Sequence, residues 1–226
     1  LETAGGGDAM MVWFDERINE GQPVQDIYAQ RIGLDASGDI VNRWTEPDAG
    51  GIPICNVDGK QEGAKVTYYN EDWNVVVWED SRHNDFLSDN GLPSTIDIYA
   101  QFIDVDGNKA DAYYENGTPL VSNLCYDPMS CPPTFPLTDQ TNPRVKASGI
   151  TDAPAFVIWI DKRNFNDDIY MQMITPDNPA VLAGDSNFPF DGVAVTDAPN
   201  AQGSARLTTD AFGGAFIVWD DLQNAD

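Results

Sequence analysis

Two stretches recur along this chain and decide its fold: Val75-Val-Val-Trp78-Glu-Asp80-Ser-Arg82 and Asp97-Ile-Tyr-Ala-Gln101. The pattern Trp-x-Asp-x-Arg is followed each time by Asp-Ile-Tyr-x-Gln. Asp26 and Asp97 are 71 residues apart, and Asp97 and Asp168 are again 71 apart. Residues that return at a fixed spacing usually solve the same packing problem in each unit. The repeat therefore indicates an architecture built from similar units.

The repeated residues are predicted to hold each unit together. They are Trp13, Asp15, Arg17 and Asp26; Trp78, Asp80, Arg82 and Asp97; Trp159, Asp161, Arg163 and Asp168; and Trp219 and Asp221 in a last copy with Gln223 in place of arginine. We expect each tryptophan to be buried between sheets, with its indole N–H donating to an acceptor. Each arginine can bind a carboxylate through two hydrogen bonds. Its partner is either the aspartate of the same pattern or the aspartate that opens the next strand.

Alternation of apolar and polar residues divides each unit into four strands, which we name a to d. The predicted strands are 64–69, 144–148 and 205–209 (a); 9–14, 74–79, 155–160 and 215–220 (b); 26–32, 97–103 and 168–174 (c); and 51–55, 117–121 and 192–195 (d). No segment has a 3.6-residue apolar period, so little helix is expected.

Four-stranded antiparallel units in series are typical of β-propeller blades. The sequence thus predicts an all-β, propeller-like array of about three blades, with half-blades at the ends, in one repeat domain that spans 1–226. The blade-like units are 1–58, 59–123, 142–197 and the incomplete 198–226, and 124–141 is a Cys/Pro-rich insertion. The strand order begins with b and stops after b. Three interpretations follow: part of a larger ring, half-blades that pair with another chain, or an open array.

The quoted stretches, with Asp97 continuing through Phe-Ile-Asp-Val-Asp-Gly107, resemble the units of secreted bacterial β-propeller-type repeat proteins. The resemblance covers nearly the whole chain. It implies an extracellular or cell-surface module attached to a larger exported protein. The shared motif carries no catalytic residue, so the resemblance implies no activity.

The charge of the chain excludes some partners. There are 37 acidic and 12 basic residues, giving a net charge of −25. Nucleic acid is not expected as a partner, because phosphate binding needs clusters of Lys and Arg. No apolar run is long enough to span a membrane, and no signal peptide is visible. The expected partners are other protein chains or further blades, with carbohydrate as an additional candidate.

Calcium is the best ligand prediction. The stretch Asp104-Val-Asp106-Gly-Asn108-Lys-Ala-Asp111 supplies oxygens around a glycine turn, as hard-cation loops do. An ordinary Asp-Gly turn is the alternative. The segments 164–168 and 84–85 are weaker candidates.

Other residues give local predictions. Cys125 and Cys131 bracket a short loop that a disulfide could close, and geometry must decide this. Cys55 would then be free or paired with another chain. The lone His83 is expected at the surface. The aromatic residues that could stack on sugars are Trp44, Trp73, Tyr113, Tyr114 and Tyr126.

Three functions are compatible with these patterns. The first is a non-enzymatic extracellular module for surface assembly or ligand adhesion. The second is a secreted carbohydrate-active enzyme that uses Asp and Glu side chains, and the third is a filament subunit joined through half-blades. A local function is expected where the repeats differ, in the loops 81–95 and 124–141.

Overall fold

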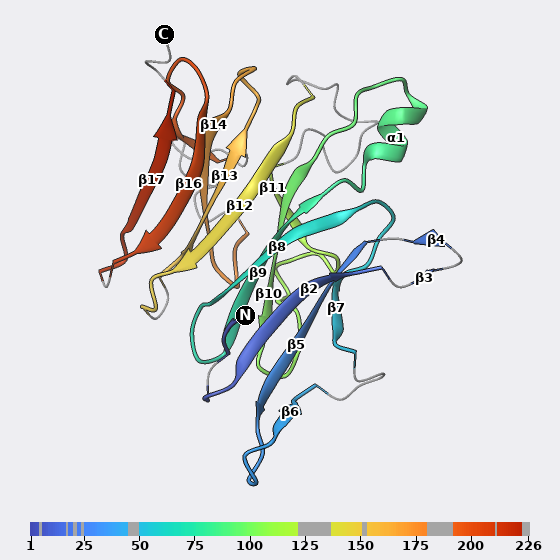
Figure 1. Ribbon diagram of the computed structural model, residues 1–226, viewed down its shortest axis with the longest axis vertical. Helices are drawn as coiled ribbons and strands as arrows, with labels where there is room; N and C mark the ends of the chain where they lie inside the picture. Colours follow the sequence, from blue (N-terminus) through green and yellow to red (C-terminus); the bar gives the residue numbers. More distant parts are fainter. Residues whose placement is uncertain are drawn as a thin grey trace.

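The computed structural model describes residues 1–4, 6–16, 18–19, 22–23, 25–44, 50–121, 137–150, 153–179, 192–210 and 212–222. The structure is all-β, as the sequence predicts, and its main sheets are antiparallel. Figure 1 shows the sheets following one another in chain order, from β2 and β5 in blue to β16 and β17 in red. Within the described residues they form a series that does not close on itself.

The second and third units are complete four-stranded sheets in which the order in space equals the order in sequence. The second contains β8 (Gln61–Tyr68), β9 (Trp73–Asp80), β10 (Asp97–Asp104) and β11 (Thr118–Val121). The third contains β12 (Gln140–Ala147), β13 (Ala155–Asp161), β14 (Asp168–Ile174) and β15 (Val193–Thr196). These correspond to predicted strands a, b, c and d, and strands that follow one another in the chain are neighbours in each sheet, as is usual.

The first unit departs from the predicted order. Its central strands are β2 (Ala9–Asp15) and β5 (Asp26–Leu34), and both β6 (Ile40–Asn42) and β7 (Ile52–Cys55) pair with β5. The short strand β1 (Glu2–Thr3) pairs with β2 at the position of strand a. The prediction that the chain begins with strand b is therefore wrong. Strands this short lack enough residues to show an alternating pattern.

Three further elements complete the described fold. The strands β3 (Ile18–Asn19) and β4 (Gln22–Pro23) form a small hairpin between β2 and β5. The helix α1 (Asn84–Asp89) lies in the b–c loop of the second unit. The fourth unit is the two-stranded sheet of β16 (Gln202–Thr209) and β17 (Ala215–Asp221). Trp219 in this sheet is 37% exposed, whereas Trp78 and Trp159 are fully buried between sheets.

Neighbouring units pack through strand a of the later unit. β8 contacts β2 and β5, β12 contacts β8, β9 and β10, and β16 contacts β12, β13 and β14. The apolar cores lie between these sheets; one of them joins Met10 and Ile27 of the first unit to Val76 and Trp78 of the second. Burial of apolar area between successive sheets therefore holds the series together.

The same backbone hydrogen bond joins each pair of units. The N–H of the first residue of strand a donates to the carbonyl that precedes strand c of the unit before it. The pairs are Gln61 to Gln25 at 2.8 Å, Gln140 to Ile96 at 2.8 Å and Gln202 to Asp167 at 2.6 Å. This repeated contact fixes how one sheet is placed against the next.

Candidate functional site

The repeated tryptophan and aspartate are bonded to each other within each complete unit. The indole N–H donates to Oδ2 of the aspartate two residues on, at 3.1 Å for Trp13, 2.9 Å for Trp78 and 3.0 Å for Trp159. Each indole also stacks on the tyrosine of Asp-Ile-Tyr, with ring centroids 6.2 to 6.5 Å apart. The antiparallel register places the two rings opposite each other, as Trp78 and Tyr99 show.

The arginine completes this group, which we call the Trp–Asp–Arg cluster. Arg82 donates from Nε to Asp80 Oδ1 at 2.9 Å and from Nη2 to Oδ2 at 2.5 Å. Arg163 binds Asp161 in the same way, at 2.9 and 2.6 Å. The partner is thus the aspartate of the same pattern in both units. Arg17 lies outside the described residues. A buried carboxylate needs such a partner, since an unpaired buried charge is costly.

The guanidinium also lies over the tyrosine ring, 3.9 Å from the centroid of Tyr99 for Arg82 and 4.1 Å from that of Tyr170 for Arg163. Cation–π contact therefore adds to the charged hydrogen bonds. In the second unit the thiol of Cys55 lies beside the cluster, and Arg82 Nη2 is 3.3 Å from its Sγ. Burial, together with the negative charge of Asp80, raises the pKa of this thiol. In the second and third units the indole N–H, both carboxylate oxygens, and Nε and Nη2 of the arginine are therefore bonded within the protein.

A glycine packs against the repeated tryptophan in three units. The strand prediction alone did not identify this role. Gly51, Gly117 and Gly192 precede strand d and have positive φ angles of 84°, 84° and 73°. A Cβ atom at each would lie closer than 3.0 Å to ring carbons of Trp13, Trp78 and Trp159, respectively. The signal was present in the sequence, because the glycine occupies the same place in all three units.

The aspartates that open strand c have three different environments. Asp97 Oδ2 is 3.4 Å from His83 Nδ1, which places this histidine at the cluster edge. Asp168 accepts hydrogen bonds from the side-chain amides of Asn164 and Asn166, at 2.9 and 2.8 Å.

Asp26 is buried and has no hydrogen-bond partner among the described residues. Burial raises its pKa to about 6, and the negative charges of Asp15 and Asp58 contribute to the shift. Among the described residues, this position thus has a polar side-chain partner in the second and third units but not in the first.

The predicted calcium residues form a compact turn. Asp104 Oδ1 accepts the backbone N–H of Asp106 at 2.9 Å and of Asn108 at 2.8 Å, and Oδ2 accepts the Asn108 side-chain amide at 2.9 Å. Asp111 lies in the next turn and is exposed. No group of three or more His, Cys, Asp or Glu residues suited to a metal ion occurs in the described part of the chain. Calcium binding at this turn stays a prediction.

The predicted disulfide cysteines and the aromatic candidates for sugar binding do not form a common site in the described part of the chain. Cys125, Cys131 and Tyr126 lie outside the described residues. Trp44 and Tyr113 are buried in the core, and Trp73 packs against it. Tyr114 is exposed, and its carbonyl accepts a hydrogen bond from the buried side chain of Gln101 at 2.9 Å. These four aromatic residues do not form a shared surface for a sugar ring.

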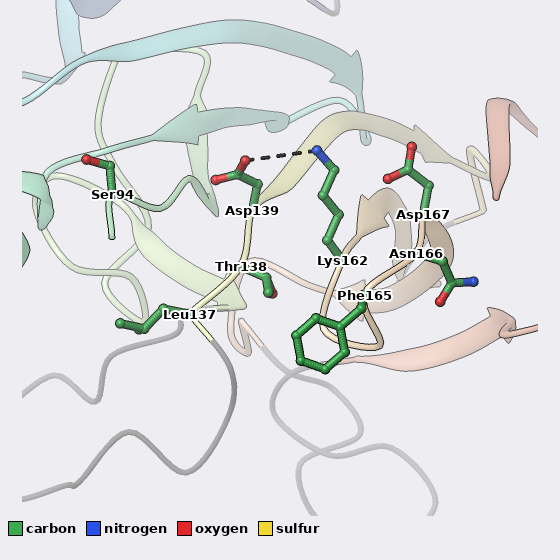
Figure 2. Close-up of a pocket in the computed structure, with 8 residues that line it drawn as sticks. All are labelled: Ser94, Leu137, Thr138, Asp139, Lys162, Phe165, Asn166 and Asp167. Atoms are coloured by element: carbon green, nitrogen blue, oxygen red, sulfur yellow. Dashed lines mark ion pairs between the residues drawn. The ribbon is translucent and has the colours of Figure 1, made fainter. Parts of the chain in front are cut away.

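A hollow lies where loops of the second and third units meet, as Figure 2 shows. Its volume is about 310 Å³. We call it the loop hollow; its lining residues are Ser94, Leu137, Thr138, Asp139, Lys162, Phe165, Asn166 and Asp167. The side chain of Lys162 points toward Asp139, with Nζ 4.0 Å from Oδ2. This is the region where the repeats differ in sequence.

Phe165 is the most unusual residue of the loop hollow. Its side chain is 86% exposed, and its φ angle is +65°. Its backbone N–H donates to the carbonyl of Lys162 at 2.8 Å, so the ring stands at the tip of a tight turn. A left-handed backbone costs a bulky residue about 1–2 kcal/mol. Strain of this kind is concentrated at functional sites. Sequence analysis missed Phe165 because it falls outside the repeated pattern.

No family model matches the chain, and no curated protein matches it. Among the described residues there is no helix of the length and apolar character that a membrane span requires.

Proposed function

We propose that this chain is a non-enzymatic, extracellular module of propeller type that binds a ligand through the loop hollow. The proposal rests on a difference between the residues that the units share and those that they do not. The Trp–Asp–Arg clusters of the second and third units are largely buried and bonded internally, whereas the loop hollow is built from residues that the units do not share. Internally bonded residues stabilise the scaffold, and divergent loops on a rigid scaffold are the usual place for binding.

The packing of the sheets supports the propeller part of the proposal. Strands a of successive units are neighbours, since β1 contacts β8, β8 contacts β12, and β12 contacts β16. A propeller places the same strand of each blade around a central axis. The contacts between successive strands a are compatible with this order and support the proposal.

A carbohydrate is the ligand class that suits the loop hollow. The exposed ring of Phe165 offers an apolar face for stacking, and Asn166, Asp167, Asp139 and Lys162 supply donors and acceptors beside it. A few polar groups around an aromatic surface are typical of sites that bind small polar molecules.

The test is a binding measurement with Phe165→Ala. Titration calorimetry against a panel of neutral oligosaccharides should find a ligand whose affinity falls about tenfold or more in this variant, because the stacking face is lost. Phe212→Ala is the matched control, since Phe212 is a loop residue that is 90% exposed and lies outside the loop hollow. Equal affinities in the two variants would exclude the loop hollow as the site.

A second candidate is a glycoside hydrolase. The carboxylates of Asp139 and Asp167 line the same hollow beside an aromatic ring, and glycoside hydrolysis needs two carboxylates across the scissile bond. Release of reducing sugar that disappears in both Asp139→Asn and Asp167→Asn would establish the enzyme. Binding without any such release would establish the non-enzymatic module.

A further inference from the structure

The cations of this chain divide into two groups. The structure describes eleven of the twelve Lys and Arg residues, all except Arg17. Eight of them pair with carboxylates: Arg31 and Arg43 with Asp8, Lys60 with Glu62, Arg82 with Asp80, Lys109 with Glu115, Lys146 with Glu2, Lys162 with Asp139, and Arg163 with Asp161. The other three are Lys65, Arg144 and Arg206, which have no ion pair with a described carboxylate. In a protein with three times more acids than bases, this exception needs a cause.

The three unpaired cations occupy the same position in three successive units. Each lies on strand a, opposite the residue that precedes the repeated tryptophan on strand b: Val77, Ile158 and Val218. Each follows a shift in strand register. The shift contains a residue with positive φ, namely Gly63 at 67°, Asn142 at 56° and Ser204 at 54°. A bulge redirects the side chains that follow it, and all three cations line the same hollow.

These side chains converge on one hollow. Lys65, Arg144 and Arg206 line a space of about 190 Å³ together with Lys146 and Glu2. Arg144 and Arg206 also line an adjoining space of about 260 Å³, with Asn142 and Ser204 at its wall. We call the two spaces together the basic groove. Glu2 binds Lys146 at 2.9 Å, so the only acid that lines the groove is already paired with another cation.

Within the described part of the chain, the hydrogen bonds of these three cations go only to neutral groups. Lys65 Nζ donates to the carbonyl of Gly63 at 2.7 Å, and Arg206 Nη1 donates to the carbonyls of Ser204 and Ala205 at 3.1 and 3.0 Å. Arg144 Nε is buried and has no acceptor among the described residues. Such a donor is costly to leave unbonded.

The electrostatic environment agrees with this geometry. The pKa of Lys65 is lowered, first by burial and then by the positive charge of Arg144, while Glu79 opposes the shift. Glu79 is engaged elsewhere, since its Oε1 accepts the backbone N–H of Asn142 at 2.7 Å. The groove therefore concentrates positive charge within a strongly negative protein, and such a cavity attracts anions.

We propose that the basic groove binds a small multivalent oxyanion, with Lys65, Arg144 and Arg206 as its ligands. The planar guanidinium groups of the two arginines match carboxylate and phosphate oxygens in pairs, and the lysine supplies a point charge. Carboxylates and phosphates share the chemistry that this groove recognises. The inference does not depend on closure of the sheets into a ring, because the neighbouring strands β8, β12 and β16 carry all three ligands. It is also separate from the loop hollow, with which it shares no lining residue.

The experiment is calorimetric titration of the purified chain with citrate and with inorganic phosphate at low ionic strength. We expect binding of at least one anion, weakened about tenfold or more by Arg144→Gln and by the more exposed Arg206→Gln. Lys60→Gln is the control, because it removes the same charge from a surface ion pair outside the groove. Binding of citrate alone would indicate a carboxylate ligand, and binding of phosphate alone would indicate a phosphate ligand.

Two results would overturn the proposal. One is the absence of heat with either anion in a chain whose circular dichroism shows a folded β protein. The other is equal weakening by Lys60→Gln and by the folded Arg206→Gln variant, which would indicate a general effect of net charge. Phe165→Ala should leave anion binding unchanged, so failure of the loop hollow as a carbohydrate site would not affect this result.

Discussion

Replacement of Gly117 by alanine tests whether the repeated glycine and tryptophan act together. Two costs add at this position. The φ angle of 84° disfavours alanine by about 1–2 kcal/mol, and the new Cβ would lie closer than 3.0 Å to ring carbons of Trp78. Overpacking of a buried site typically costs about 1–3 kcal/mol more. Because Trp78 is fully buried and bonded to Asp80, its ring cannot move aside without breaking that contact.

Gly38 provides a matched control for the backbone cost. Its φ angle is 85°, and a Cβ atom there would meet nothing within 4 Å. Gly38→Ala should therefore show the conformational cost alone, and the difference between the two variants isolates the contact with Trp78. For a chain of this size, about 1–3 kcal/mol corresponds to a difference of roughly 2–12 °C in melting temperature. The measurement is thermal unfolding followed by circular dichroism. Equal melting temperatures for the two variants would refute this account of the glycine.

Three further predictions concern charge. Arg82→Met should lower the free energy of unfolding in urea by about 3–5 kcal/mol, because it leaves buried Asp80 without its cationic partner. Lys60→Met breaks an exposed ion pair and should cost less than about 1 kcal/mol. Similar costs for the two variants would contradict the stabilising role of the buried pair. Asp26→Asn should raise the melting temperature at pH 7.5 but not near pH 3.5. The pKa of Asp26 is about 6 in the folded state, above the ordinary 3.8. Ionisation of Asp26 therefore destabilises the folded state increasingly as the pH rises from 3.8 to 6, and the full cost is present above pH 6. A gain that is equal at both pH values would contradict this assignment. If calcium occupies the 104–111 turn, EDTA should lower the melting temperature of the wild type but not of Asp104→Asn, and an unchanged wild-type value would remove calcium from the description.

The strands could be predicted from sequence because their signal is dense and repeated. Strand b of the second unit was expected at 74–79 and is found at Trp73–Asp80, since alternation and the tryptophan pattern mark it together. The two-residue β1 is too short to show the alternation of a strand, and the six-residue α1 is too short to show the 3.6-residue period of a helix. Their formation depends on what they pack against, which a linear pattern does not contain.

The candidate sites were harder to predict for a different reason. Asp26, Asp97 and Asp168 are evenly spaced, but Lys65, Arg144 and Arg206 are separated by 79 and 62 residues, because loops of unequal length intervene. Only the register of each strand a against its strand b shows that they are equivalent. Phe165 gives no repeated signal at all, and its significance depends on exposure and backbone angle.

The third unit shows how a structural repeat can hold in place the loop that we propose as a binding site. Phe165 stands between Arg163, which is bonded to Asp161, and Asp168, which is held by Asn164 and Asn166. Both ends of the loop are therefore fixed to buried groups within a few residues of the exposed ring. A loop that is ordered before it binds loses less conformational entropy on association, so more of the contact energy appears as affinity. The Trp–Asp–Arg cluster of the third unit thus explains why a strained, exposed phenylalanine can persist at the loop hollow.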